Sequence, residues 1–251
     1  MKITKLLFTV LITLPFLFSC QKPFNDPDPP PQSPGSQLFL PKTYTEDYTS
    51  SVSGHSVITF NLSYDASDRL ISMISAASPG DKFIYQYSGN TVTMDLYNSN
   101  LISIHEIFYL NSSSFIDSTL QYNDTKDTST EKYLYNSNKQ LLKLIEYDYT
   151  TATGAEIDNI HNYLYDANGN LIKENDNSGE ITYEYSTLLN TLSVGLDLLP
   201  RSKYLVKTTS FSIGGTTGIL NHTYTFDSSN RLTTEKIVAD TGEVAIKTYT
   251  Y

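Results

Sequence analysis

The sequence predicts an all-β fold, an antiparallel meander of β-hairpins with one short helix. Three observations predict it. Tyr (20 residues) and Phe (11 residues) are abundant beside Thr, Ser and Asn, while Trp is absent, a composition typical of strands and turns. A turn-forming unit recurs along most of the chain. Tyrosines repeat at every second position between the turns, which is the period of a β-strand.

Residues 1–19 have the features of a secretory signal peptide. Two lysines precede the apolar segment Leu6–Phe18, which is too short to cross a bilayer. The segment Leu17-Phe18-Ser19-Cys20 resembles a bacterial lipobox, which implies cleavage before Cys20 and acylation of its thiol and amino group. Cys20 is the only cysteine, so we expect a lipidation site and no disulfide in the mature chain.

Residues 20–42 are predicted to be the lipidated cysteine and a Pro-rich tether, and residues 43–251 a single β repeat domain. Seven of the ten prolines fall between Pro23 and Pro41. Such a segment favours extended polyproline geometry, which could hold the domain up to roughly 60 Å from the membrane. Without Lys2 and Lys5, 15 basic residues face 27 acidic ones, a net charge of −12, so nucleic acid is not an expected partner.

Five imperfect copies of one unit predict tight turns. The clearest copy, Tyr165 to Leu171, has an aromatic residue, then Asp, and an apolar residue at the seventh position. The Asp side chain can accept backbone hydrogen bonds, and the turn needs a left-handed residue before the return strand. That residue is Asp68, Ser114, Lys139, Gly169 or Asn230, and the apolar residue is Leu70, Phe115, Leu141, Leu171 or Leu232. The 61 residues between the starts of the last two copies leave room for a degenerate or replaced unit.

Tyr-x-Tyr pairs mark the predicted strands. There are six of them: Tyr85/Tyr87, Tyr133/Tyr135, Tyr147/Tyr149, Tyr163/Tyr165, Tyr183/Tyr185 and Tyr249/Tyr251. Residues two apart share one face of a strand, so we expect aromatic ladders across neighbouring strands. A structural ladder is favoured over a carbohydrate platform, and the sequence leaves unknown which aromatic residues face a ligand. The segment Ser88–Thr91 predicts a further turn.

One stretch departs from the strand period. Leucines at helical spacing follow Ser186, a possible cap, and precede Pro200, a stop; they are Leu188, Leu189, Leu192, Leu196 and Leu199. This pattern predicts a short helix over residues 186–199, packed over one end or edge of the sheet.

The units resemble two known families. Asp68-Arg69-Leu70 and Asn230-Arg231-Leu232 partly keep the Y-D-x-x-G-R-L signature of YD (Rhs-type) repeats, whose shells are many times longer. The lipobox, the tether, the Tyr87–Thr91 hairpin and the Leu-rich stretch resemble more closely the Bacteroidetes lipoproteins of domain-of-unknown-function family 4595. This resemblance covers residues 43–251. It implies a porin-like, curled and strongly twisted sheet or open barrel, a topology that does not by itself imply membrane insertion, and it carries no established activity.

The sequence predicts no catalytic, cofactor-binding or metal-ligating residue. The four histidines, His55, His105, His161 and His222, lie far apart in apparent strands, where a structural role is favoured. Asp166, Asn168 and Asn170 alternate like the first ligands of a calcium loop, but the twelfth position of that loop is Asn177 rather than Glu. The acidic residues Asp176 and Glu180 indicate a solvated hairpin tip.

Ser118 is a second candidate modification site. It lies in Asp117-Ser118-Thr119, which resembles the O-glycosylation sequence of this phylum.

The leading functional hypothesis is a monomeric, non-enzymatic lipoprotein of the outer membrane, on either its periplasmic or its surface face. It would act as a binding or structural module, with the bilayer as partner through acylated Cys20 and with a glycan or an envelope protein as a further partner. The alternative is a glycan-directed hydrolase that uses Asp and Glu at loop tips. Two carboxylates about 5–10 Å apart in a concave site would indicate the enzyme.

Overall fold

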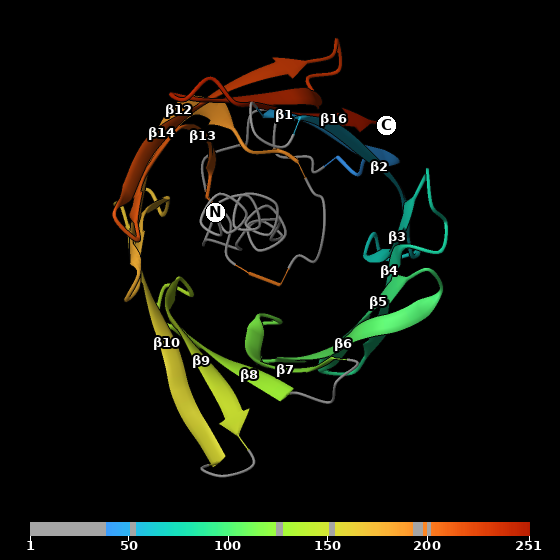
Figure 1. The fold of residues 1–251 in the computed structure, drawn as a ribbon, viewed down its shortest axis with the longest axis vertical. Coiled ribbons are helices and arrows are strands. Elements are labelled where there is room, and N and C mark those ends of the chain that lie inside the picture. The colour runs from blue at the N-terminus through green and yellow to red at the C-terminus, as the bar shows by residue number, and fades with distance from the viewer. Residues whose placement is uncertain (1–38, 51–53, 124–127, 151–153, 193–197, 200–201) are drawn as a thin grey trace, which may run out of the picture.

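The computed structural model describes residues 39–50, 54–123, 128–150, 154–192, 198–199 and 202–251. These residues form sixteen antiparallel strands that close into a barrel (Figure 1). The strands are β1 (Thr43–Ser50), β2 (Gly54–Tyr64), β3 (Leu70–Ser75), β4 (Lys82–Ser88), β5 (Thr91–Asn98), β6 (Leu101–Leu110), β7 (Ile116–Asn123), β8 (Thr128–Tyr135), β9 (Leu141–Thr150), β10 (Gly154–Tyr165), β11 (Leu171–Asn175), β12 (Gly179–Leu189), β13 (Tyr204–Ile213), β14 (Thr216–Phe226), β15 (Leu232–Ala239) and β16 (Val244–Thr250).

Each strand pairs with its neighbours in sequence, and β1 closes the ring against β16. Thr43 lies opposite Thr250, and Thr49 lies opposite Val244. The predicted antiparallel meander is therefore confirmed, whereas the expected open barrel is wrong. Closure pairs the backbone N–H and C=O groups that an open sheet would leave unpaired along its two edges. Because these groups are the same in every residue except proline, the side-chain pattern does not predict whether the sheet closes.

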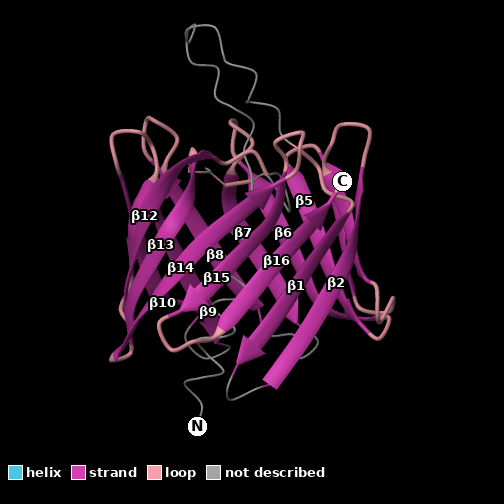
Figure 2. Ribbon diagram, turned by 90° about the horizontal axis from the view of Figure 1, so that it is seen from above, coloured by secondary structure: helices cyan, strands magenta, loops and turns pink. Residues whose placement is uncertain are grey.

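The repeat unit forms the same turn five times. All five predicted residues have positive φ: Asp68 (61°), Ser114 (64°), Lys139 (61°), Gly169 (82°) and Asn230 (60°). The Asp or Asn side chain accepts the expected backbone hydrogen bonds; the Asp166 Oδ1 atom accepts N–H groups of Asn168 and Asn170, each at 2.8 Å. The turns join an even-numbered strand to the next odd-numbered one, so all lie at one end of the barrel, the repeat end (Figure 2).

The second copy starts one residue later than the sequence alignment places it. The Asn111 side chain accepts the N–H groups of Ser113 and Phe115, so Asn111 matches Asp166 of the clearest copy. Ile116, which is 3% exposed, is then the returning apolar residue. Phe115, the residue predicted for that role, packs against the Tyr135 ring with centroids 5.4 Å apart.

The second tyrosine of most Tyr-x-Tyr pairs forms a bond that we call the tyrosine clamp. Its hydroxyl donates to the carbonyl of the apolar residue that begins the preceding strand. The bonds are Tyr87 to Leu70 (2.9 Å), Tyr135 to Ile116 (2.7 Å), Tyr185 to Leu171 (2.6 Å) and Tyr251 to Leu232 (2.9 Å). Tyr165 hydrogen-bonds to the backbone of Leu141. Each clamp joins two strands at the end where no turn connects them.

The Arg of the YD-like signature supports two of these clamps. Arg69 pairs with Asp65 at 2.6 Å and lies 4.2 Å from the centre of the Tyr87 ring. Arg231 repeats the arrangement with Asp227 and Tyr251, at 2.7 Å and 4.7 Å. The guanidinium therefore ties the turn carboxylate to the clamp tyrosine through an ion pair and a cation–π contact.

In five of the six pairs the first tyrosine faces the barrel interior, whereas Tyr147 faces outward, because its neighbour Glu146 faces inward opposite Glu131. These five pairs belong to even-numbered strands, and the odd-numbered strands between them begin with the clamped leucine or isoleucine, so extended aromatic ladders are not formed among the described residues. Tyrosine stacks on tyrosine where the barrel closes, at Tyr44 and Tyr249, with ring centroids 5.6 Å apart. The period of two correctly predicted that residues two apart share a face. Which residue lies beside each tyrosine on the next strand depends on the strand pairing, which the period does not give.

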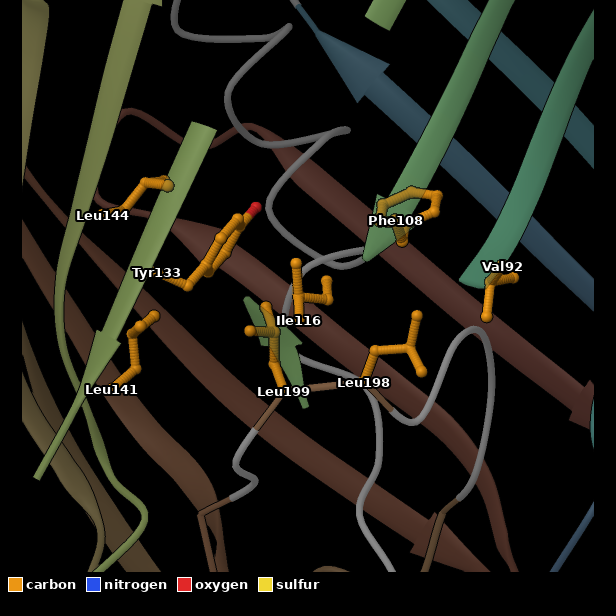
Figure 3. Packing of buried hydrophobic residues seen from close by; sticks show 8 residues of the cluster. All are labelled: Val92, Phe108, Ile116, Tyr133, Leu141, Leu144, Leu198 and Leu199. Carbon is orange, nitrogen blue, oxygen red and sulfur yellow. The ribbon is translucent and has the colours of Figure 1, made fainter. Parts of the chain in front are cut away.

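The predicted helix is not found in the described part of residues 186–199. Ser186 to Leu189 continue strand β12, and residues 193–197 and 200 lie outside the described residues. Leu192 packs against the wall that contains Tyr44 and Leu232. Leu198 and Leu199 pack against a different wall (Figure 3). Leu192, Leu198 and Leu199 therefore contact different strands inside the barrel, whereas Leu188 and Leu189 are exposed on β12.

This inward segment occupies the place of the missing repeat unit. It connects β12 to β13, and its Thr191 and Leu198 carbonyl groups accept the N–H groups of Phe39 and Ile116, at 3.1 and 3.0 Å. A clamp is nevertheless kept after it, because the Tyr224 hydroxyl donates to the Val206 carbonyl at 2.6 Å. Together with the buried residues Val92, Phe108, Leu141 and Leu144, the segment makes an apolar layer at the repeat end.

No helix in the described part of the chain is long and apolar enough to cross a membrane.

Candidate functional site

The inner face of the barrel wall carries most of the buried ionisable groups. Side chains alternate between the two faces of each strand, and the buried Tyr44, Tyr85 and Tyr133 identify the inner set. On that face, carboxylates gather in two regions. We call them the balanced wall, on β14, β15, β16 and β1, and the acid wall, on β6 to β11 together with the turn after β11.

In the balanced wall, a carboxylate is matched by a lysine and a histidine. Glu235 lies 3.5 Å from the Lys247 ammonium and 2.9 Å from His222 Nδ1, and it also accepts a hydrogen bond from the Tyr224 hydroxyl at 3.3 Å. Burial opposes its charge, but attraction to Lys247 and the bond to His222 prevail and lower the pKa of Glu235 to about 2. Glu235 is therefore ionised at neutral pH.

Glu46 completes the balanced wall. It lies opposite Lys247 in the strand register and accepts a hydrogen bond from the Tyr44 hydroxyl at 3.2 Å. Burial raises the pKa of Glu46, while Lys247 and Tyr44 act in the opposite direction. One lysine thus serves two carboxylates on adjacent strands.

In the acid wall, three glutamates lie on nearby strands. Glu131 is directly opposite Glu146 in the register of β8 and β9, and Glu106 lies two strands away on β6. Burial, followed by repulsion from Glu131, raises the pKa of Glu106 to about 8. The pKa of Glu131 is also raised, chiefly by burial, although the hydroxyls of Tyr133 and Thr119 donate hydrogen bonds to its carboxylate. Glu106 is therefore protonated at neutral pH.

His161 is the one cationic side chain at the acid wall among the described residues. Its Nε2 atom lies 3.2 Å from Glu146, and its Nδ1 atom lies 3.7 Å from both Glu174 and Asp176. Burial opposes its charge, but the hydrogen bonds and attraction of Glu146 and Glu174 outweigh burial and raise the pKa of His161 to about 10. The acid wall then has five acidic side chains and one imidazolium, which contacts three of them, Glu146, Glu174 and Asp176.

Neighbouring polar groups hold this cluster in place. The Asn159 amide donates to Asp176 at 2.9 Å, and the Tyr183 hydroxyl donates to Glu174 at 3.4 Å. Asp176 also accepts the N–H groups of Ser178 and Gly179, at 2.7 and 3.0 Å, in the turn between β11 and β12. A β-bulge in β10 between Ile157 and Asn159 places both Asn159 and His161 on the inner face.

The structure separates the four predicted histidines into two kinds. His55 and His105 lie on the outer face beside Asp47 and Asp95, at 2.8 and 2.6 Å. His161 and His222 lie on the inner face in ion pairs. Among the described residues, no group of three or more His, Cys, Asp or Glu side chains could hold a metal ion.

The calcium-like pattern is a turn. The Asp166 carboxylate is occupied by backbone and side-chain groups of Asn168 and Asn170, and these bonds lower its pKa against the effect of burial. The side-chain oxygen of Asn170 accepts a hydrogen bond from the backbone N–H of Lys203 at 3.1 Å. This bond holds the end of the inward segment.

The remaining candidates lie apart from the acid wall. Ser118 faces outward opposite Lys132, and Glu180 faces outward in an ion pair with Lys173 at 2.6 Å. Cys20 lies outside the described residues, so its acylation stays a prediction.

Sequence reasoning missed the acid wall. Part of it could have been found from the Tyr-x-Tyr pairs. The residue two positions before the first tyrosine shares its strand face, and this residue is Glu131 before Tyr133 and His161 before Tyr163. Their meeting with Glu106, Glu146 and Glu174 depends on the register of six neighbouring strands, β6 to β11, which the sequence does not give.

No model of a known protein family matches the chain, and no curated protein matches it; membership of family 4595 therefore stays a prediction. Two similar solved structures are porin-like proteins. One, from Bacteroides uniformis, is 12% identical, covers 86% of this chain and 99% of its own, and has a TM-score of 0.63. The other, from Bacteroides vulgatus, is 12% identical, with coverages of 84% and 98% and a TM-score of 0.49. The first likeness shows that this chain has the fold of a porin-like barrel.

Proposed function

We propose that the protein is an outer-membrane lipoprotein of the family 4595 type, anchored through acylated Cys20, whose barrel binds a hydroxyl-rich ligand of the glycan class without cleaving it. The acid wall carries this proposal. Carboxylates and tyrosine hydroxyls are the groups that proteins use to hold sugar hydroxyls, and tyrosine rings add apolar contact.

The electrostatics of the acid wall favour a binding role over a purely structural one. A glutamate kept in a buried position without a matching cation destabilises the fold, as the raised pKa of Glu106 indicates. The balanced wall shows that the same barrel can neutralise a buried carboxylate with Lys247 and His222. Perturbed carboxyl groups gathered on one concave surface are typical of functional sites.

Calorimetric titration with a panel of soluble glycans tests the binding. We expect a glycan that binds the native protein to lose affinity about tenfold or more with Glu146→Gln, because one charge-assisted hydrogen bond contributes about 1.5–3 kcal/mol. Asp95→Asn, on the outer face, is the matched control and should leave affinity unchanged. Equal losses in both variants, or no binding across the panel, would reject a glycan-binding acid wall.

The hydrolase alternative keeps one specific observation in its favour. Glu106 is protonated at neutral pH, as a general acid must be, and Glu131 and Glu146 face each other with Cβ atoms about 4.5–5.5 Å apart. This differs from the sequence expectation, which placed catalytic carboxylates at loop tips. Release of reducing ends from a bound glycan by the native protein, abolished in Glu106→Gln, would establish the enzyme and overturn the non-enzymatic proposal.

Anchoring has its own test. Fatty-acid labelling and detergent partition should show the native chain in the membrane phase and the Cys20→Ala variant unlabelled. Labelling that persists in the variant would contradict acylation at Cys20.

A further inference from the structure

The outer face of the barrel differs on its two sides. Around β14 to β2, the outward residues are mainly small and polar, such as Thr45, Thr223 and Thr248. On β6 to β10, large apolar side chains are exposed to solvent. Eight of the thirteen exposed large apolar residues of the described chain belong to these five strands or their ends: Leu101, Ile102, Tyr109, Tyr122, Leu134, Leu142, Ile157 and Leu164.

Half of these residues form a row near the repeat end. The row, which we call the apolar rim, consists of Tyr109, Leu134, Leu142 and Leu164, with exposures of 40, 40, 41 and 56%. Lysines alternate with them: Lys143 is opposite Leu134, and Lys173 is opposite Leu164. Lys132 lies in the same row opposite Ser118. Leucine, tyrosine and lysine side by side are typical of a surface that meets the headgroup region of a bilayer.

The rim lies at the end of the barrel where the tether arrives. The described chain begins at Phe39, which bonds to Thr191 at the repeat end, and Thr43 pairs with Thr250 there. Cys20 precedes Phe39 by fewer than 20 residues. A Pro-rich segment of that length reaches at most roughly 60 Å, so it keeps this end near the lipid.

We propose that the apolar rim rests on the surface of the bilayer that holds the Cys20 acyl chains, so that the barrel is oriented as well as tethered. Tyr109, Leu134, Leu142 and Leu164 enter the headgroup region, and the three lysines contact lipid phosphates. This orientation rests on the anchoring proposed above and goes beyond it, because it adds the outer face of the folded barrel as a second contact with the bilayer. Lys132 and Lys173 already pair with outer-face carboxylates, Asp117 at 2.5 Å and Glu180 at 2.6 Å, so their contacts with lipid phosphates would replace these ion pairs.

Vesicle flotation with the Cys20→Ala protein separates the rim from the acyl anchor. We expect this unlipidated protein to float with vesicles of phosphatidylethanolamine and phosphatidylglycerol. Leu134→Ser combined with Leu164→Ser should reduce the bound fraction about tenfold, because each leucine that leaves a lipid contact weakens binding severalfold. The matched control is Val57→Ser with Ile219→Ser, two outer-face residues of the opposite side that are 52 and 43% exposed, and it should bind like its parent.

Three outcomes would overturn the proposal. They are no flotation of the Cys20→Ala protein, equal losses in the rim and control variants, and a dimer in light scattering that the rim variant alone abolishes without any vesicle binding. The last outcome would assign the rim to a second copy of the chain. Fatty-acid labelling of the native chain is read separately, so a failure of acylation is distinguishable from a failure of the rim.

Discussion

The balanced wall and the acid wall solve the same problem differently. Both bury glutamates next to tyrosines on the inner face of one barrel. In the balanced wall, Lys247 and His222 hold Glu235 ionised, with a pKa of about 2. In the acid wall, Glu106 has no such neighbour among the described residues, and its pKa rises to about 8. The difference shows that the state of a buried carboxyl group depends on the cation across the strand rather than on burial itself.

The largest expected effect is the loss of the cation from the balanced wall. Lys247→Met should lower the free energy of unfolding at neutral pH by about 3–5 kcal/mol, because Glu235 and Glu46 would stay buried without their lysine. Urea denaturation measures the change. Lys236→Met, on the outer face of β15, is the control. If the two variants lose similar stability, the contrast between the walls has no energetic basis.

The acid wall should respond to pH in the opposite sense. A carboxyl group whose pKa is raised by folding binds more protons when folded, so it weakens the fold as pH rises from about 4.5 to about 8. Glu106→Gln should remove that loss, and at pH 9 it should stabilise the protein by on the order of 2–4 kcal/mol. Glu235, with its lowered pKa, acts at the other extreme: its contribution is complete above about pH 4.5 and is lost as pH falls toward 2.

Unfolding curves of the native protein, Glu106→Gln and Glu235→Gln at several pH values measure these slopes. A native protein whose stability does not fall between pH 5 and pH 8, or a Glu106→Gln variant with the native slope, would contradict the assignment of a protonated Glu106.

A smaller effect should distinguish the tyrosine hydroxyls of the two walls. Tyr133 donates to Glu131, a carboxyl group with a raised pKa, whereas the Tyr224 hydroxyl is shared between the Val206 carbonyl, at 2.6 Å, and Glu235, at 3.3 Å, and Glu235 keeps Lys247 and His222. Tyr133→Phe should cost about 1.5–3 kcal/mol and Tyr224→Phe about 1 kcal/mol. Thermal unfolding of the two variants measures which one loses more stability. A larger loss for Tyr224→Phe than for Tyr133→Phe would contradict the prediction that the acid wall depends more on its tyrosine hydroxyl.

The smallest effects concern the repeat turns, which should not differ between the walls. Gly169→Val should cost about 1–2 kcal/mol, since a β-branched residue is strained at φ 82° although the nearest side-chain atom, on Gln140, is 3.7 Å from the added Cβ. Lys139→Gly beside the acid wall and Asn230→Gly beside the balanced wall should each stay within about 0.5 kcal/mol of the native protein. A Lys139→Gly cost above that of Gly169→Val would show that the turns are not equivalent.

The local parts of the fold were predictable, and the long-range parts were not. Turn chemistry identified the left-handed residues Asp68, Lys139 and Gly169, because a backbone conformation leaves its mark on the residue that adopts it. Closure of β1 on β16, by contrast, depends on how many strands accumulate and how strongly they are inclined, which no short pattern encodes.

The candidate site shows the same division. Tyr133 and Tyr163 were assigned to one face of their strands correctly, but Glu106, Glu131 and Glu146 come together from three strands whose registers are fixed by bulges and turn lengths. The described leucines after Ser186 do not share one face: Leu188 and Leu189 are exposed on β12, Leu192 packs on one wall of the interior, and Leu198 and Leu199 pack on another.

The tyrosine clamp has a consequence for how such barrels can change size. Each clamp is made within one pair of strands. It joins the carbonyl of the first residue of an odd-numbered strand to the hydroxyl of a tyrosine near the end of the next strand, as in Leu70 with Tyr87 and Leu171 with Tyr185. A duplicated pair of strands would therefore bring its own turn, its own clamp and its own buried leucine, and it would require nothing new of its neighbours. Gene duplication could widen or narrow the ring by whole hairpins, while the wall chemistry of each added hairpin diverged independently.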